Sequence, residues 1–269
     1  LTSKTVAVST IDDTLIEERN ADFHLSDESI AIGAETEALG GYFEAVELTG
    51  GGASNRFTLD GFTGSGFLDG AGAGDIYDIT VAESGSDSTF LDLRDSGLIG
   101  IDELLYRGSS GNDLIQLDTV YVLAEDPEGR FPGGRPFGAE YGAHGDGLLI
   151  VHFDPSNADA YQAASLGNED SLTGLEEAVL GQGGAFQVIN YSSVEENRVF
   201  AGEGNDKIIS DDTAQNMSVY GNAGEDEFYV GSILETDTVL VEGREVTVVT
   251  RYTRGASFPM SFYGGADDD

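Results

Sequence analysis

Residues 200–208 read FAGEGNDKI and residues 220–228 read YGNAGEDEF, and this repeated pattern decides the fold. Each copy has a turn of small residues, then an Asp, one spacer residue and a large apolar residue. Further copies, of which the last has Asn in place of Asp, are residues 68–77 (LDGAGAGDIY), 106–115 (YRGSSGNDLI) and 49–57 (TGGGASNRF). Such repetition is typical of proteins in which each repeat packs against its neighbours.

The spacing of the copies predicts the length of one coil. Asn55 precedes Asp75 by 20 residues. Asp206 precedes Asp226 by the same number, and Asp113 follows Asp75 by 38. A recurring step near 20 residues is expected for one coil of a β-solenoid.

A second pattern, an apolar residue followed by an acid, recurs at a nearly constant distance before the turns. Three pairs begin seven residues before a turn and one begins six before: Phe43–Glu44, Ile101–Asp102 and Val194–Glu195, then Leu175–Glu176. Because these acids recur once per coil, we expect a structural row at the strand ends, with a catalytic role as the alternative.

Strands are expected on both sides of each turn, because apolar residues alternate there with the period of a strand buried on one face. Two residues before each turn stands an apolar residue that should face the core, forming one inward ladder: Leu48, Leu68, Tyr106, Val199, Val219 and Phe262. The sequence therefore predicts an all-β fold, a parallel β-solenoid of the β-helix or β-roll kind. We expect N-terminal coils at residues 1–121, an irregular excursion at 122–170 and C-terminal coils at 171–269.

Composition restricts the function. The formal net charge is −38 at pH 7, while 39% of the residues are hydrophobic. A folded chain so acidic needs solvated carboxylates, high salt or bound cations, and it is a poor partner for nucleic acid or anionic membranes. Cys is absent, which excludes disulfides and thiolate metal sites. With no apolar run long enough to span a membrane and no initial Met, we expect a secreted, mature or excised segment at the cell surface.

The glycine-rich Asp turns resemble single, imperfect copies of the calcium-binding nonapeptide of RTX (hemolysin-type) proteins. The resemblance covers roughly residues 40–120 and 170–269 and favours the giant RTX-related extracellular surface proteins of bacteria. One Asp turn alternates here with one apolar–acid pair, whereas an RTX β-roll places two nonapeptides in a coil. The resemblance implies that Ca²⁺ is the cofactor and lies between adjacent coils.

Calcium prefers carboxylate and carbonyl oxygens, which these turns supply. Asp206 with Asp226 is the best candidate pair. Asp75 is a weaker candidate because Ala71 and Ala73 replace two glycines of the pattern and Asn55 stands in the preceding copy. The full set of candidate calcium ligands is Asp75, Asp113, Gly202, Gly204, Asp206, Gly221, Gly224, Asp226 and Asp269. The alternative reading is that Gly and Asp merely form ordinary turns.

The excursion at residues 122–170 holds four of the five prolines and departs from the repeat. We expect a strand at residues 147–153 and a short helix at residues 157–164, capped by Ser156. Four side chains in it could suggest a metal or catalytic site, but they match no known signature and are expected to be solvated or structural: His144, Asp146, His152 and Asp154.

Two functions remain open. The first is a structural or adhesive calcium-binding segment of a surface filament, matrix or S-layer-like assembly, without enzymatic activity. The alternative is a carbohydrate-active β-helix of the polysaccharide lyase or uronate epimerase type, which would need a basic groove for its acidic substrate. Expected partners are copies of the chain, or adjacent segments of a longer one, stacked head to tail through a turn at residues 264–269, with surface polysaccharide as a further candidate.

Overall fold

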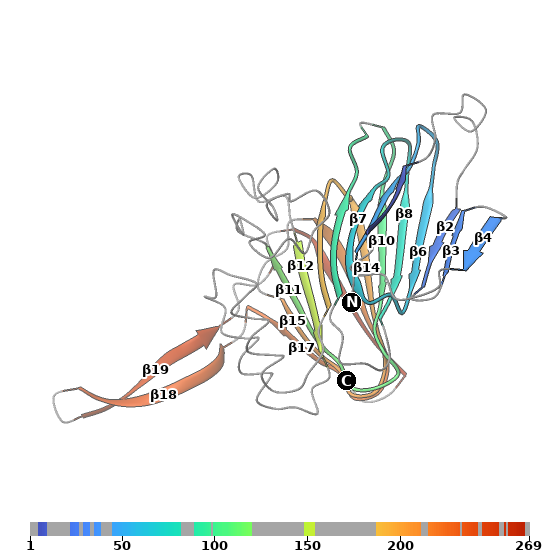
Figure 1. Cartoon of the computed structure of the whole chain (residues 1–269). Helices are drawn as coiled ribbons and strands as arrows, with labels where there is room; N and C mark the ends of the chain where they lie inside the picture. Colours follow the sequence, from blue (N-terminus) through green and yellow to red (C-terminus); the bar gives the residue numbers. More distant parts are fainter. Residues whose placement is uncertain are drawn as a thin grey trace.

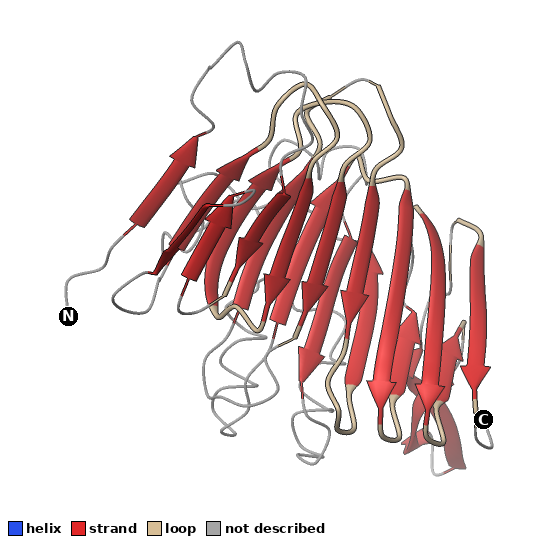
Figure 2. Ribbon diagram, turned by 90° about the vertical axis from the view of Figure 1, so that its right-hand side faces the viewer, coloured by secondary structure: helices blue, strands red, loops and turns tan. Residues whose placement is uncertain are grey.

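The computed structural model describes a chain made of strands and connecting turns (Figures 1 and 2). The described residues are 5–9, 22–26, 29–32, 35–38, 45–81, 89–97, 99–119, 148–153, 187–210, 215–231, 233–241, 244–252, 256 and 258–266. No described segment forms a helix long and apolar enough to cross a membrane.

Nine strands form the first sheet. In spatial order they are β1 (Thr5–Ser9), β5 (Ala45–Thr49), β7 (Gly64–Asp69), β9 (Thr89–Arg94), β13 (Gln187–Ser192), β12 (Leu148–Phe153), β11 (Leu114–Thr119), β15 (Lys207–Ser210) and β17 (Glu227–Val230). All neighbours pair in parallel except β12, which is antiparallel to both β11 and β13.

The second sheet also has nine strands. In spatial order they are β20 (Met260–Gly265), β16 (Asn216–Ala223), β14 (Glu196–Glu203), β10 (Glu103–Arg107), β8 (Ile76–Thr80), β6 (Arg56–Asp60), β2 (Asp22–Leu25), β3 (Ser29–Ile32) and β4 (Glu35–Ala38). Pairing is parallel from β20 to β2. A separate antiparallel hairpin, β18 (Ile233–Val241) and β19 (Arg244–Tyr252), projects away from both sheets (Figure 1).

From β5 onward the chain passes from one sheet to the other and back, and we call one such passage a circuit. Turns from the first sheet to the second lie at one end of the strands, which we call the first edge; they include residues 50–55, 70–75, 95–102 and 193–195. Turns in the opposite direction form the second edge and include residues 108–113, 204–206 and 224–226. Figure 2 shows turns gathered at both ends of the strands. The prediction of an all-β fold with parallel strands is confirmed.

The 20-residue step is confirmed as a register between neighbouring strands, because Arg56 pairs with Ile76 and Lys207 pairs with Glu227. The turn of Asp75, however, lies on the first edge, whereas that of Asp113 lies on the second. The interval of 38 residues between these two Asp is therefore not a whole number of circuits. The same glycine–Asp pattern serves both edges.

Apolar side chains of both sheets form one core. The six residues predicted to form a single inward ladder do pack in or against this core, but they belong to two ladders. Leu48 and Leu68 pair in the first sheet, where Leu68 also pairs with Leu93. The ladder of the second sheet is Tyr106, Val199, Val219 and Phe262, continued on the other side by Ile79 and Leu59.

Aromatic rings form a second inward row on the second sheet, two residues before the ladder described above. Phe23 stacks on Phe57 with ring centroids 4.8 Å apart, and Phe57 stacks on Tyr77 at 5.2 Å. Parallel in-register pairing places equivalent side chains one strand spacing apart, about 4.8 Å, which is also a suitable distance for stacked rings. The register therefore accounts for both the stacking and the burial of these three residues.

The strand expected within residues 122–170 is confirmed as β12. It is inserted into the first sheet between β11 and β13, and it contains the backbone of His152. Other expectations fall outside the described residues: the helix at 157–164, His144, Asp146, Asp154, Glu44, Leu175–Glu176 and Asp267–Asp269.

Neighbouring turns at the second edge lie too close for side chains at some positions. Gly224 has a φ of 134°, and a Cβ there would overlap the carbonyl oxygen of Gly204 in the preceding turn. Gly51 is the converse case, since a Cβ there would meet nothing within 4 Å. The close stacking of turns thus depends on particular glycines, not on glycine content in general.

We predict that Gly224→Ala lowers the free energy of unfolding by about 2 kcal/mol or more, through the left-handed backbone and the collision with Gly204. The matched Gly51→Ala substitution should change it by less than about 1 kcal/mol, because its only systematic effect is on the unfolded chain. Urea unfolding followed by circular dichroism measures both. Equal effects of the two substitutions would contradict the stacking described above.

Candidate functional site

Acidic or amide side chains line the first edge, at the residue that precedes each of four strands of the second sheet. The row is Asn55, Asp75, Asp102 and Glu195, before β6, β8, β10 and β14. Each backbone N–H donates to the side chain of the next residue in the row. The distances are 2.6 Å from Asn55 N to Asp75 Oδ1, 2.7 Å from Asp75 N to Asp102 Oδ1, and 2.8 Å from Asp102 N to Glu195 Oε2.

An equivalent row lies on the second edge, before strands of the first sheet. The N–H of Asp113 donates to Asp206 Oδ1 at 2.7 Å, and the N–H of Asp206 donates to Asp226 Oδ1 at 2.9 Å. All three side chains are buried. The other oxygen of Asp206, Oδ2, is buried and has no hydrogen-bond partner. The expected stacking of Asp206 and Asp226 is therefore confirmed.

The second edge carries another row that the sequence interpretation missed. The N–H of Asn205 donates to Asn112 Oδ1 at 2.8 Å, and the N–H of Glu225 donates to Asn205 Oδ1 at 3.0 Å. These bonds run in the opposite direction along the stack to those of the Asp row. The recurring Asn–Asp dipeptide at 112–113 and 205–206 was the available signal.

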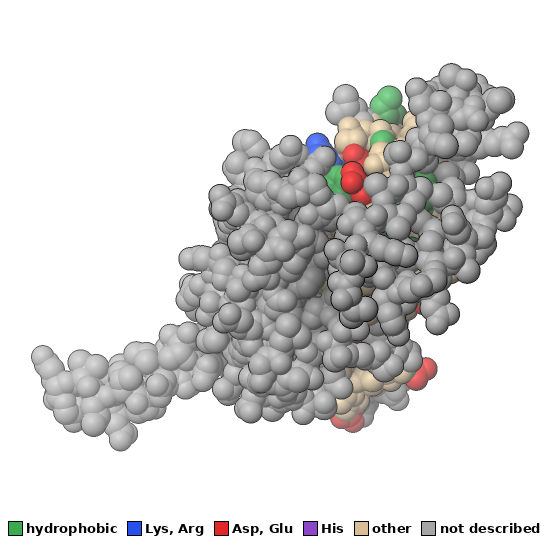
Figure 3. Space-filling model, viewed as in Figure 1, with side chains coloured by type: hydrophobic (Ala, Val, Ile, Leu, Met, Phe, Trp, Pro, Cys, Tyr) green, Lys and Arg blue, Asp and Glu red, His purple; other side chains and the backbone are tan. Residues whose placement is uncertain are grey.

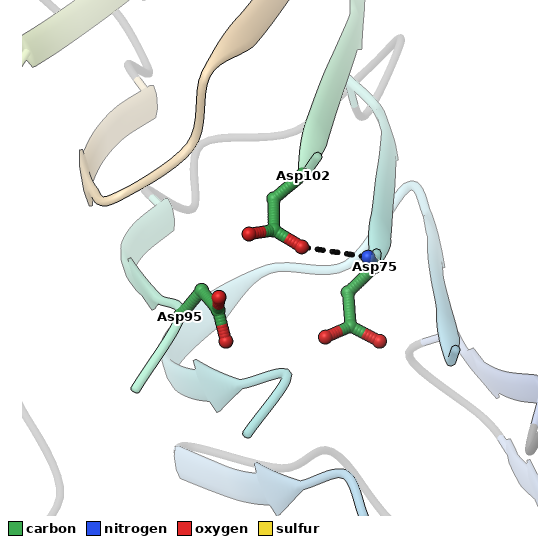
Figure 4. A group of neighbouring side chains, drawn as sticks. All are labelled: Asp75, Asp95 and Asp102. Atoms are coloured by element: carbon green, nitrogen blue, oxygen red, sulfur yellow. Dashed lines mark hydrogen bonds between the residues drawn. The ribbon is translucent and has the colours of Figure 1, made fainter. Parts of the chain in front are cut away.

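Three Asp side chains come together at the first edge (Figure 4). Asp75 is 0% exposed, Asp95 6% and Asp102 2%, and one ligand oxygen from each lies within 4.8 Å of the others. Figure 4 shows the carboxylates of Asp75 and Asp95 turned toward each other, with that of Asp102 beside them. By its donor type and spacing, this buried group could hold a metal ion.

Burial and mutual proximity change the acidity of these side chains. Loss of solvent raises the pKa of Asp75 to about 6, although donors on Asn55 oppose the shift. Burial, with a hydrogen bond shared with Asp95, raises the pKa of Asp102 to about 8. Burial and the charges of Asp113 and Asp226 together raise the pKa of Asp206 to about 7. The hydrogen bond from the N–H of Asp113 opposes this shift in the pKa.

Of the glycines predicted as ligands, Gly204 and Gly224 lie in turns of the second edge, whereas Gly202 and Gly221 lie near the ends of β14 and β16. Gly202, Gly204 and Gly224 have φ values of 121°, 105° and 134°, which glycine adopts more readily than other residues. A Cβ on Gly221 would overlap the carboxylate of Asp226, so this Asp folds back over the start of its own turn. Asp269 lies outside the described residues.

On the first edge, the equivalent positions of the Asp75 turn hold Ala71 and Ala73. Both have positive φ, 70° and 62°, a conformation that alanine adopts at a cost. This turn therefore keeps a positive φ at both positions despite the replaced glycines.

The sequence interpretation also missed Asp95 as part of the group. Asp95 stands two residues after the inward-facing Leu93, the position occupied by Gly50 after Leu48 and by Gly70 after Leu68. Looking two residues beyond every inward residue would have identified Asp95, which stands where the turns after Leu48 and Leu68 begin with glycine. Asp102 and Glu195 were predicted to stand in a row at the strand ends, and the structure places both in one row there.

No family model matches the chain, and neither a curated protein nor a solved structure matches it.

We predict that the metal-free protein, kept in chelator, loses stability as the pH rises from about 4 to about 8. Over this range the folded state holds protons on Asp75, Asp102 and Asp206 that the unfolded chain has released, so raising the pH favours unfolding. Thermal unfolding at fixed ionic strength measures the trend. Asp102→Asn should weaken it, whereas Asp60→Asn, at an exposed site, should leave it unchanged.

Proposed function

We propose that the chain is a calcium-binding β-solenoid segment of an extracellular structural or adhesive assembly, and that it has no enzymatic activity. In this proposal the circuits described above are the coils of the solenoid, and Ca²⁺ neutralises the carboxylates stacked along its edges. The resemblance of the glycine–Asp turns to RTX repeats supports the same ion.

The observation that carries the proposal is the row of Asp113, Asp206 and Asp226 on the second edge. Three buried acids follow one another there at the spacing of one strand, and Asp206 Oδ2 has no hydrogen-bond partner. Burying like charges is costly unless a cation or a proton compensates them. Calcium suits such a place because it binds carboxylate and carbonyl oxygens in flexible numbers.

The distribution of charge favours this proposal over a uronate-acting enzyme. The outer surface of the second sheet carries Arg56, Arg107 and Arg198, but each is engaged by an acid. Arg56 and Arg107 both pair with Asp78, and Arg198 pairs with Glu103. On the face shown in Figure 3, acidic side chains (red) reach the surface near the top and at the bottom. These three arginines therefore supply no unneutralised basic row for an acidic polysaccharide.

We further propose that β20 stacks on another copy of the chain. β20 is the last strand of the second sheet, and its inward residues Met260 and Phe262 are only partly buried. On the outer face Tyr263 stacks on Tyr220 at 4.6 Å and is 50% exposed. The turn that follows β20 already continues the repeat, because the N–H of Ala266 donates to the carbonyl of Asn222 at 3.0 Å.

We predict that Ca²⁺ raises the melting temperature and that chelator lowers it. Each occupied site adds about 3 kcal/mol when free Ca²⁺ exceeds its dissociation constant about 100-fold. Asp206→Asn should reduce the rise, because the amide retains the hydrogen bond from Asp113 but lacks the charge. Asp60→Asn is the control and should behave as wild type. A melting temperature that is the same in Ca²⁺ and in chelator would sink the proposed function.

We predict that the protein forms concentration-dependent assemblies in Ca²⁺ that dissociate in chelator, measured by light scattering after gel filtration. Tyr263→Glu should weaken assembly, because it places a charge on the exposed ring position of β20. Thr58→Glu is the matched control, since it adds the same charge on β6 of the second sheet, which is not a neighbour of β20. A protein that stays monomeric in Ca²⁺ at all concentrations would show that β20 has no such partner.

A further inference from the structure

The turn at residues 95–102 differs from the other glycine-rich turns of the first edge. It has eight residues, whereas the turn at 70–75 has six. In the register of β7 and β9, Asp95 takes the position of Gly70, since the preceding residues Asp69 and Arg94 are paired. A carboxylate thus stands where the two preceding turns have glycine, at Gly50 and Gly70.

The preceding turn contributes a second carboxylate, that of Asp75. A Cβ on Gly70 would overlap Asp75 Oδ2, so the side chain of Asp75 folds back over Gly70. Its other oxygen, Oδ1, faces Asn55, whose N–H donates at 2.6 Å and whose amide Nδ2 donates at 3.1 Å. Oδ2 has no hydrogen-bond partner although Asp75 is 0% exposed. Figure 4 shows a carboxylate oxygen of Asp75 directed toward Asp95.

The other two acids are fixed by backbone donors. Asp102 Oδ1 accepts the N–H of Asp75 at 2.7 Å, and Asp95 Oδ1 accepts the N–H of Gly97 at 2.8 Å. No Lys or Arg among the described residues forms an ion pair with any of the three acids. Three carboxylates are therefore held around one point, with no cationic side chain of the described chain to compensate them.

The two turns cover this point closely. A Cβ on Gly74 would lie 2.7 Å from the carbonyl oxygen of Ile101, and one on Gly97 would lie 2.7 Å from the Cα of Gly72. The N–H groups of Ala71 and Ser96, one in each turn, both donate to Asp69 Oδ1, at 3.1 and 3.0 Å. The carboxylates are thus enclosed by backbone and are not displayed on an open surface.

We propose that Asp75, Asp95 and Asp102 bind one Ca²⁺ ion that joins two consecutive turns of the first edge. Hard oxygen donors without nitrogen or sulfur favour Ca²⁺ or Mg²⁺, and a ligand set taken from turn residues suits the adaptable coordination of Ca²⁺ better than the strict octahedron of Mg²⁺. Asp95 and Asp102 lie outside the glycine-rich repeat, so this centre differs from the repeat-turn sites on the second edge. The inference rests on the proposed function in assuming that the protein meets calcium.

The test is calcium titration calorimetry together with thermal unfolding in Ca²⁺ and in chelator, on the whole chain. Asp95→Asn should remove one bound ion per chain, or weaken it roughly tenfold or more, and should reduce the rise in melting temperature that Ca²⁺ produces. In chelator the same variant should melt no lower than wild type, because the amide removes one of three crowded acids. A merely structural Asp95 would instead lower the melting temperature in both conditions.

Asp102→Asn is the second variant, since its amide oxygen retains the hydrogen bond from Asp75, and it should show the same loss. Asp206→Asn, on the other edge, should leave this ion in place and add its effect independently. This inference would be overturned if Asp95→Asn and Asp102→Asn both kept the full calcium stoichiometry and the wild-type calcium response while Asp206→Asn did not. The proposed function would then still stand. Absence of calcium binding in the wild type would overturn both.

Discussion

The hydrogen bond from a backbone N–H to a buried carboxylate of the neighbouring turn is the interaction on which the stacking of turns depends. It occurs at both edges, as from Asp75 to Asp102 and from Asp113 to Asp206. A charged acceptor makes this bond stronger than one to a neutral group, but only while the acid remains ionised in a buried position. The geometry that aligns the strands therefore also creates a demand for positive charge, and in a chain of net charge −38 the side chains meet little of it.

Much of the fold followed from the sequence because it depends on local rules. The glycine–Asp spacing predicted the 20-residue register, and apolar alternation predicted the buried faces, including that of Tyr106. The sequence could not separate the two edges, because glycine–Asp turns of similar composition occur at both. The interval of 38 between Asp75 and Asp113, close to twice 20, suggested two whole coils, although these two Asp lie at opposite ends of the strands.

The candidate site was less predictable, since it depends on register across an irregular turn. Asp206 and Asp226 were found because each copy repeats the pattern. Asp95 was not found, because it belongs to no copy of the glycine–Asp repeat. It comes close to Asp75 and Asp102 only because a turn of eight residues is stacked on a turn of six. Asp102 was recognised as a row residue, but its proximity to Asp95 has no counterpart in the other turns that the structure describes. Irregular positions within a repeat are therefore those for which the structure adds most.

The antiparallel strand β12 has a mechanical consequence. In the first sheet, three strands lie between β9 and β15, namely β13, β12 and β11. In the second sheet, β10 and β14, which precede and follow these three strands in the chain, are direct neighbours. Each strand adds about 4.8 Å to the length of its sheet, and packed sheets lie about 10 Å apart. One layer is thus longer than the other at this point, by an amount comparable with their separation. Segments joined end to end would then trace an arc, with the shorter second sheet on its concave side.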